Sequence, residues 1–104
     1  MRPVLHPAAE AEYLAAISWY AADYPGRGDR FFDAAEAVLD RIGEAPRSFP
    51  FWRRRKDVRA CVVPRFPFTV FFVAEPAGVT VYAVAHDKRR PGYWKKRIAP
   101  RYDY

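Results

Sequence analysis

The feature that most constrains this fold is a change in the spacing of apolar residues about halfway along the chain. In the first half, apolar side chains recur every three or four residues, which is typical of helices that bury one face. From residue 58 they form continuous or alternating runs rich in β-branched and aromatic residues, which is typical of strands. In a chain of 104 residues, this single change predicts one domain in which helices pack on a sheet.

A first helix is expected over residues 8–24. Pro7 suits its first turn, because the N–H that a proline lacks has no partner there in any helix. The spacing i, i+4, i+7, i+11 places four large side chains on one face, and we expect this face in the core. These residues are Tyr13, Ile17, Tyr20 and Tyr24.

A second helix is expected after the break at residues 25–28. Asp29 suits its N-cap, and Gly43 followed by Pro46 suits its end. Because the link is so short, the two helices should form an antiparallel hairpin. The expected core face of the second helix consists of Phe31, Ala35, Val38 and Ile42.

Four strands are expected, one before the helices and three after them. The first is short, since Pro7 ends it. The expected ranges are 2–6, 58–63, 66–74 and 79–85, with a hairpin turn over residues 75–78. The resulting order, β-α-α-β-β-β, predicts an α+β domain in which the helical hairpin packs on one face of an antiparallel sheet.

The last part of the chain is expected to leave the sheet. Residues 87–98 form a basic loop in which Pro91 precedes a short helix or an irregular segment. Residues 99–104 form a tail. We therefore place a single domain at residues 1–98.

Composition excludes several classes of protein. No run approaches the ~20 apolar residues that cross a bilayer, and no secretory signal is visible, so we expect a cytoplasmic protein without a membrane partner. The chain has one cysteine, Cys61, and two histidines, too few for an internal disulfide or a Cys/His zinc site. We expect no metal and no cofactor, and we expect Cys61 to be a small buried hydrophobe.

The charge of the chain is distributed unevenly. Its formal net charge is +6, from 18 Lys and Arg against 12 Asp and Glu. Residues 1–46 sum to −4, whereas residues 47–104 sum to +10. A basic half of this strength predicts an anionic partner, which is either a nucleic acid or an acidic protein.

Three stretches of the chain carry a family pattern through their order and spacing. They are His6-Pro7-Ala8-Ala9-Glu10 with Trp19-Tyr20, then Arg30-Phe31-Phe32 through Ile42 and Pro46 to Phe49-Pro50, then Arg59 with residues 66–68 and residues 81–94. Together they resemble the RelE/ParE superfamily of toxins from type II toxin–antitoxin systems. The likeness spans nearly the whole chain, and the closing stretch, residues 86–94, is its most specific part.

The resemblance implies a partner and a choice between two targets. The partner is a cognate antitoxin, expected to be of the ribbon-helix-helix type, that wraps the toxin. One branch of the superfamily cleaves mRNA in the ribosomal A site, whereas the ParE branch poisons DNA gyrase without being a hydrolase. Residues 68–72 lack the arginine usual in the ribonuclease branch, and residues 86–94 are closer to the ParE pattern.

We therefore expect a ParE-like toxin that inhibits growth by binding DNA gyrase and is not an enzyme. The first alternative is a RelE-like, ribosome-dependent mRNA endoribonuclease. The second alternative is a non-catalytic nucleic-acid-binding module, whose affinity would fall steeply with salt.

The candidate site residues lie mainly after the last strand. If the chain cleaves RNA, His86, Arg89 and Tyr93 are the candidate catalytic residues, because the reaction needs a proton acceptor, a proton donor and a cation on the phosphate. The alternative gives His86 a structural role, capping the strand or ordering the basic loop. We expect Trp94 to be buried and to hold the end of the chain on the core. The candidates for binding the target or a nucleic acid are Arg59, Lys88, Arg89, Arg90 and Tyr93.

Two further predictions concern the segment that leads into the second strand. The candidate antitoxin contacts are Trp52, Arg53, Arg54 and Arg55, which alternatively form a solvated strand entry. Arg59 alternates with its neighbours and so points to the opposite face from Val58. If the helices cover the Val58 face, Arg59 lies on the open face. Otherwise it pairs with a helix carboxylate, for which the candidates are Glu10, Glu12 and Glu36.

Overall fold

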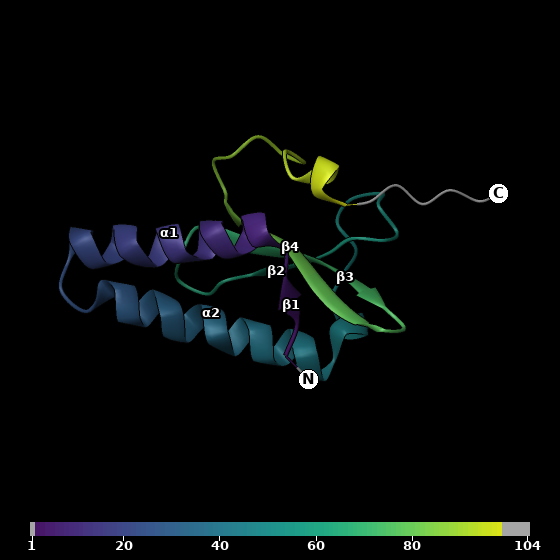
Figure 1. Cartoon of the computed structure of the whole chain (residues 1–104), viewed down its shortest axis with the longest axis horizontal. Helices are drawn as coiled ribbons and strands as arrows, with labels where there is room; N and C mark the ends of the chain where they lie inside the picture. Colours follow the sequence, from purple (N-terminus) through teal and green to yellow (C-terminus); the bar gives the residue numbers. More distant parts are fainter. Residues whose placement is uncertain (1, 99–104) are drawn as a thin grey trace.

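The computed structural model describes residues 2–98, and within them two α-helices pack on a four-stranded sheet (Figure 1). This confirms the predicted α+β class and the order β-α-α-β-β-β. The predicted tail at residues 99–104 lies outside the described residues. The elements are β1 (Val4–Leu5), α1 (Pro7–Asp23), α2 (Arg27–Glu44), the 3-10 turn η1 (Pro46–Ser48), β2 (Arg59–Val62), β3 (Phe68–Glu75), β4 (Gly78–His86) and the 3-10 turn η2 (Lys95–Arg97).

The sheet has the strand order β1-β4-β3-β2. Strands β2, β3 and β4 form the predicted antiparallel meander, in which a two-residue turn joins β3 to β4 and pairs Glu75 with Gly78. Strand β1 lies beside β4 and runs parallel to it, so the complete sheet is mixed rather than wholly antiparallel. A parallel neighbour is possible here because the helical hairpin and the meander separate the two strands along the chain.

The helices begin differently from one another. Pro7 occupies the first turn of α1 as predicted, and the N-cap is His6, whose Nδ1 accepts a hydrogen bond from the N–H of Ala8 at 3.0 Å. For α2 the predicted Asp29 cap is wrong. The helix starts three residues earlier, after its N-cap Gly26, whose left-handed φ of 81° turns the chain sharply into the second helix.

Gly28 explains why the second helix can start so early. It lies inside α2 and is buried where the two helices approach each other. A Cβ at this position would lie 2.9 Å from both the Cβ of Ala21 and the carbonyl oxygen of Ile17. The predicted core position Tyr24 is wrong, because this residue caps α1 with extended backbone and is 61% exposed.

Each face of the sheet is covered by a different part of the chain. The helices cover the face that carries Cys61 and Val63, and this cluster includes the predicted core residues of α2. The other face carries Val58 and is covered by the segment after β4, whose Trp94 is 1% exposed. Burial of Cys61 and Trp94 was predicted and is confirmed.

A group of three side chains fastens the start of the chain to α2. The Arg2 guanidinium donates to both Glu36 oxygens, at 2.6 and 3.1 Å, and the Tyr13 hydroxyl donates to Glu36 Oε2 at 2.6 Å. Burial opposes ionisation of Glu36, but the hydrogen bonds from Arg2 and Tyr13 outweigh it and lower the pKa of this carboxyl. We name Arg2, Tyr13 and Glu36 the N-terminal cluster.

Candidate functional site

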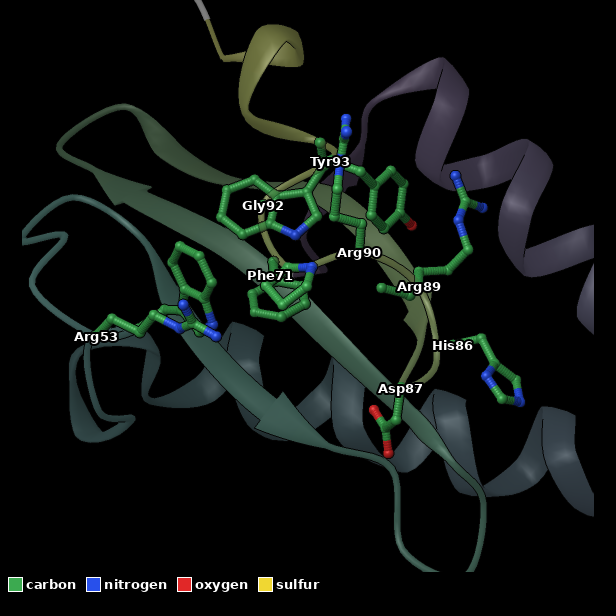
Figure 2. Close-up of a pocket in the computed structure, with 12 residues that line it drawn as sticks. Arg53, Phe71, His86, Asp87, Arg89, Arg90, Gly92 and Tyr93 are labelled. Carbon is green, nitrogen blue, oxygen red and sulfur yellow. The ribbon is translucent and has the colours of Figure 1, made fainter.

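A small cavity lies where the segment after β4 meets the loop before β2 (Figure 2). Its wall is aromatic: the ring of Trp94 stacks on Phe71 with centroids 4.7 Å apart and meets Trp52 edge-on at 5.1 Å. The cavity has a volume of about 150 Å³. We name it the basic pocket after its arginines, and its lining consists of Trp52, Arg53, Phe71, residues 85–87 and residues 89–94.

A second group of three side chains holds this segment in place. The Tyr93 hydroxyl donates to Glu12 Oε2 at 2.5 Å, and the Arg97 guanidinium donates to both Glu12 oxygens at 2.8 and 3.0 Å. Glu12 also accepts the N–H of Val84, while Arg97 donates to the carbonyl of Tyr82. We name Glu12, Tyr93 and Arg97 the C-terminal cluster, which joins α1, β4 and the segment after it.

These contacts determine what Tyr93 can do. Burial, followed by the hydrogen bond to Glu12 and the charge of Glu12, raises the pKa of the Tyr93 hydroxyl above its ordinary value. Its ring is covered by Arg89, whose Cζ lies 3.9 Å from the ring centroid. Tyr93 is therefore a neutral, engaged side chain at neutral pH, and its ring face is occupied by a guanidinium where a nucleic-acid base would have to stack.

His86 contacts different partners from Tyr93. Its Nδ1 accepts the N–H of Lys88 at 3.1 Å, and its ring meets Phe68, a core residue on the helix side of the sheet. Figure 2 shows its ring pointing away from Tyr93. The structure thus gives His86 the loop-ordering contact of the structural alternative and brings only Arg89 and Tyr93 of the three catalytic candidates into contact.

Unpaired arginines line the basic pocket. Arg53 stacks over Trp52, with its Cζ 4.7 Å from the ring centroid, and approaches the pocket from the side opposite His86 in Figure 2. Arg53, Arg89 and Arg90 are exposed, and none of them forms an ion pair with a carboxylate of residues 2–98. Asp87, at the edge, accepts the Thr69 hydroxyl at 2.9 Å. Positive charge consequently dominates this opening.

The remaining predicted residues lie outside the pocket. Arg59 is on the helix side of the sheet and donates to the carbonyl of Phe49 at 2.6 Å, so its partners are backbone oxygens rather than a helix carboxylate. Arg55 is half-buried and forms a bidentate pair with Asp57. Arg54 and Lys88 are exposed. Of the candidate site residues named from sequence, the pocket lining brings together Trp52, Arg53, His86, Arg89, Arg90 and Tyr93.

Sequence reasoning missed the roles of Glu12 and Arg97. The available signal was the position of Glu12, which lies between Ala9, Tyr13 and Ala16 on the buried stripe of the first helix. A carboxylate on such a stripe requires a cationic or hydrogen-bonding partner. Its partner is 85 residues away along the chain, and no spacing rule identifies it.

Residues 2–98 contain neither a candidate membrane span nor a candidate metal site. No helix within them is long and apolar enough to cross a bilayer. They also contain no group of three or more His, Cys, Asp or Glu side chains arranged to hold a metal ion.

The comparison with known protein families gives one match. A family model described as the ParE toxin of the type II toxin–antitoxin system parDE matches residues 4–91. This range includes both helices, all four strands and the arginines at positions 53, 89 and 90, but it ends before Tyr93, Trp94 and Arg97. No curated protein matches the chain significantly. The geometry of the C-terminal cluster therefore extends beyond the region that the family describes.

Proposed function

Because this chain belongs to the family of ParE toxins of type II toxin–antitoxin systems, we propose that it inhibits growth by binding DNA gyrase. Gyrase acts in the cytoplasm, so the proposal also places the chain there. A cognate antitoxin, implied by the family, neutralises the toxin, and we propose that this antitoxin is of the ribbon-helix-helix type. The basic pocket is the proposed contact with the target.

The observation that carries this proposal is a difference between two groups of residues around the basic pocket. Its arginines are exposed and lack carboxylate partners within residues 2–98. Of the groups able to transfer a proton, the Tyr93 hydroxyl donates to Glu12, and His86 uses its Nδ1 to accept the N–H of Lys88. Binding needs the first property, whereas acid–base cleavage of RNA needs accessible groups of the second kind.

The chemistry of the pocket favours an acidic partner surface. Arginine side chains bind carboxylate or phosphate through paired N–H donors, and the rigid wall of Trp52, Phe71 and Trp94 fixes the position of the opening. Charge of one sign around a small opening also speeds association with an oppositely charged partner. We assign this contact to Arg53, Arg89 and Arg90, with Lys88 beside them.

Two assays on the purified chain test the proposal. We expect inhibition of gyrase supercoiling and no cleavage of mRNA on programmed ribosomes. Arg90→Glu should weaken supercoiling inhibition roughly tenfold, because it reverses a charge at the proposed contact. Arg47→Glu is the matched control, since Arg47 is exposed and lies outside the pocket lining. It should leave inhibition unchanged.

The same assays identify the alternatives. Cleavage of ribosome-bound mRNA would replace gyrase binding with the ribonuclease hypothesis, and substitution of His86, Arg89 and Tyr93 would then test its catalytic residues. A chain that neither slows growth when expressed nor is neutralised by the product of the adjacent small gene would contradict toxicity itself. Salt-sensitive binding of nucleic acid without toxicity would support the nucleic-acid-binding module.

A further inference from the structure

Two basic segments of the chain meet over the sheet face opposite the helices. They are residues 52–56, which precede β2, and residues 88–97, which follow β4. The segments contact each other where Trp52 meets Trp94 edge-on, with ring centroids 5.1 Å apart. Positive charges that are far apart along the chain therefore lie close together.

Lys95 extends the basic pocket beyond its three arginines. Its Nζ lies 5.5 Å from the centroid of the Trp52 ring, and the Cζ of Arg53 lies 4.7 Å from the same centroid. The Lys95 side chain packs directly on Gly92, where a Cβ would lie 2.6 Å from Lys95 Cε. Because Trp52 and Gly92 both line the basic pocket, Lys95 stands at its rim, near Arg53.

The positive charges at this rim lack carboxylate partners. Arg53 lies on one side of the pocket and Arg89 on the other (Figure 2). The one carboxylate in the lining, Asp87, accepts the Thr69 hydroxyl. We name the exposed side chains at the rim the rim cations, and none of them forms an ion pair with a carboxylate of residues 2–98. They are Arg53, Arg89, Arg90 and Lys95.

The aromatic rings beside the rim cations are not available for stacking on bases. Trp94 and Phe71 are buried and stack on each other. Arg89 covers the Tyr93 ring, and two rim cations lie within 5.5 Å of the Trp52 ring centroid. Proteins bind single-stranded nucleic acids largely through exposed rings, whereas a duplex keeps its bases stacked and presents its phosphates. The surface therefore matches a duplex better than a single strand.

The composition of this surface also favours DNA over an acidic protein. Protein interfaces are built around aromatic or aliphatic anchors, whereas protein–DNA interfaces are more polar and much more positively charged. The large apolar side chains that are exposed within residues 2–98, such as Leu14 and Trp19, lie outside the pocket lining. The two basic segments instead contribute further exposed cations, at Arg54, Lys56, Lys88 and Lys96.

We propose that the rim cations bind the phosphate backbone of duplex DNA. Arginines of the basic pocket donate to the oxygens of one phosphate, and Lys95 neutralises a neighbouring one. The proposal builds on the proposed function, since gyrase acts on duplex DNA. It assigns the anionic group that faces the basic pocket to the DNA that gyrase holds, rather than to gyrase itself.

Fluorescence anisotropy of a labelled 20-base-pair DNA duplex tests this contact with the purified chain alone. Four phosphate contacts predict that the dissociation constant rises roughly a hundredfold between about 50 and 200 mM salt. Arg53→Gln with Lys95→Gln removes two of these contacts. The dissociation constant of this rim variant should be at least about tenfold higher at low salt, and it should then rise only about tenfold over the same salt range.

The matched control is Arg30→Gln with Arg47→Gln, which removes the same charge at exposed positions outside the pocket lining. It should keep the affinity for the duplex within about twofold. Equal losses in the two variants would show that DNA is bound through net charge alone, and would overturn the inference. Circular dichroism melts check that both variants fold, and Lys95→Gln alone should lower the salt dependence by half as much as the rim variant.

Two competitors distinguish the backbone of a duplex from other anions. One is a single strand of the same sequence, and the other is polyglutamate at the same concentration of charge. Both should displace the labelled duplex at least about tenfold less effectively than unlabelled duplex does. Equal or stronger competition by the single strand would overturn the inference in favour of single-stranded nucleic acid. The same result with polyglutamate would overturn it in favour of an acidic protein.

Supercoiling inhibition separates this inference from the proposed function. If the unmodified chain inhibits gyrase but does not bind the duplex, the inference fails and the gyrase proposal stands. If the chain binds the duplex through the rim cations but does not inhibit gyrase, the gyrase proposal fails and the DNA contact stands. When both hold, the chain should bind gyrase more tightly in the presence of a linear duplex, and Lys95→Gln should reduce this gain.

Discussion

Two clusters of the same composition fasten opposite ends of the chain, yet their surroundings differ. Each contains a tyrosine, a glutamate and an arginine that donates to both carboxylate oxygens. In the N-terminal cluster, the side chains of Arg2 and Glu36 are 49% and 26% exposed. In the C-terminal cluster, those of Arg97 and Glu12 are 20% and 16% exposed.

The C-terminal cluster also binds the main chain. Glu12 accepts the N–H of Val84, and Arg97 donates to the carbonyl of Tyr82, so both side chains are bonded to β4. The N-terminal cluster consists of side-chain bonds within the described residues. The comparison teaches that an identical set of side chains stabilises a fold by an amount that depends on burial and on the backbone groups it satisfies.

The largest expected effect on stability comes from removing the negative charge of the C-terminal cluster. Glu12→Gln should lower the free energy of unfolding by about 2 kcal/mol, because it leaves a poorly solvated guanidinium without its counterion. Glu36→Gln should cost about 1 kcal/mol, since water already screens Arg2. Urea denaturation measures both values, and Glu10→Gln, at an exposed position of α1, is the control.

Hydrogen exchange makes the same comparison at a single amide. The Val84 N–H should lose protection in Glu12→Gln and keep it in Glu36→Gln, because only Glu12 accepts this donor. Suppose that both variants lose the same free energy of unfolding and that the protection of the Val84 N–H does not change. The bonds to β4 would then add nothing to the stabilisation that Glu12 provides.

The sequence predicted the features that depend on local periodicity. The core residues of α2 and the three strands of the meander follow from spacings of 3.6 and two residues, and the structure confirms them. The start of α2 was predicted wrongly, because Gly28 looks like a chain breaker until the first helix packs against it. The close approach of the two helices is a feature of the tertiary structure, and no local sequence pattern predicts it.

The candidate site was predictable only in part, for a related reason. Residues around the basic pocket were identifiable because aromatic and cationic residues cluster along the sequence. The partner of Arg59 is a pair of backbone carbonyls, which have no sequence signature. The excess of positive charge in residues 47–104 was also visible in the sequence, whereas the contact between Trp52 and Trp94, which brings its two basic segments together, was not.

An intermediate effect on stability is expected at high pH from the tyrosines of the two clusters, Tyr13 and Tyr93. Burial, aided by the hydrogen bond to its glutamate, raises the pKa of each hydroxyl above its ordinary value near 10. The folded state therefore holds these protons more tightly than the unfolded state. The resulting stabilisation is complete below pH 10 and is lost as pH rises above it.

Substitution of each tyrosine tests this dependence. Tyr93→Phe should cost about 1 kcal/mol at pH 7, through the lost hydrogen bond, and should make stability fall less steeply above pH 10. Tyr13→Phe should do the same, and the double variant should be flatter still, because the two clusters share no residue. Guanidinium denaturation from pH 8 to 11 measures the slopes. Unchanged slopes in both variants would mean that folding raises the pKa of neither hydroxyl.

The smallest expected effect is at Arg2, where half of the side chain is exposed. Arg2→Ala should cost about 0.5 kcal/mol at low salt, and in 1 M salt this difference should nearly vanish because exposed charges are screened. The pKa of Glu36 is lowered by Arg2 and Tyr13, so their stabilisation is present at neutral pH and is lost as pH falls through the folded pKa. Arg2→Ala should therefore also flatten the acid side of the stability profile, as measured by thermal melts from pH 7 to 3. A cost for Arg2→Ala that persists in 1 M salt, as expected for Glu12→Gln, would remove the distinction between the clusters.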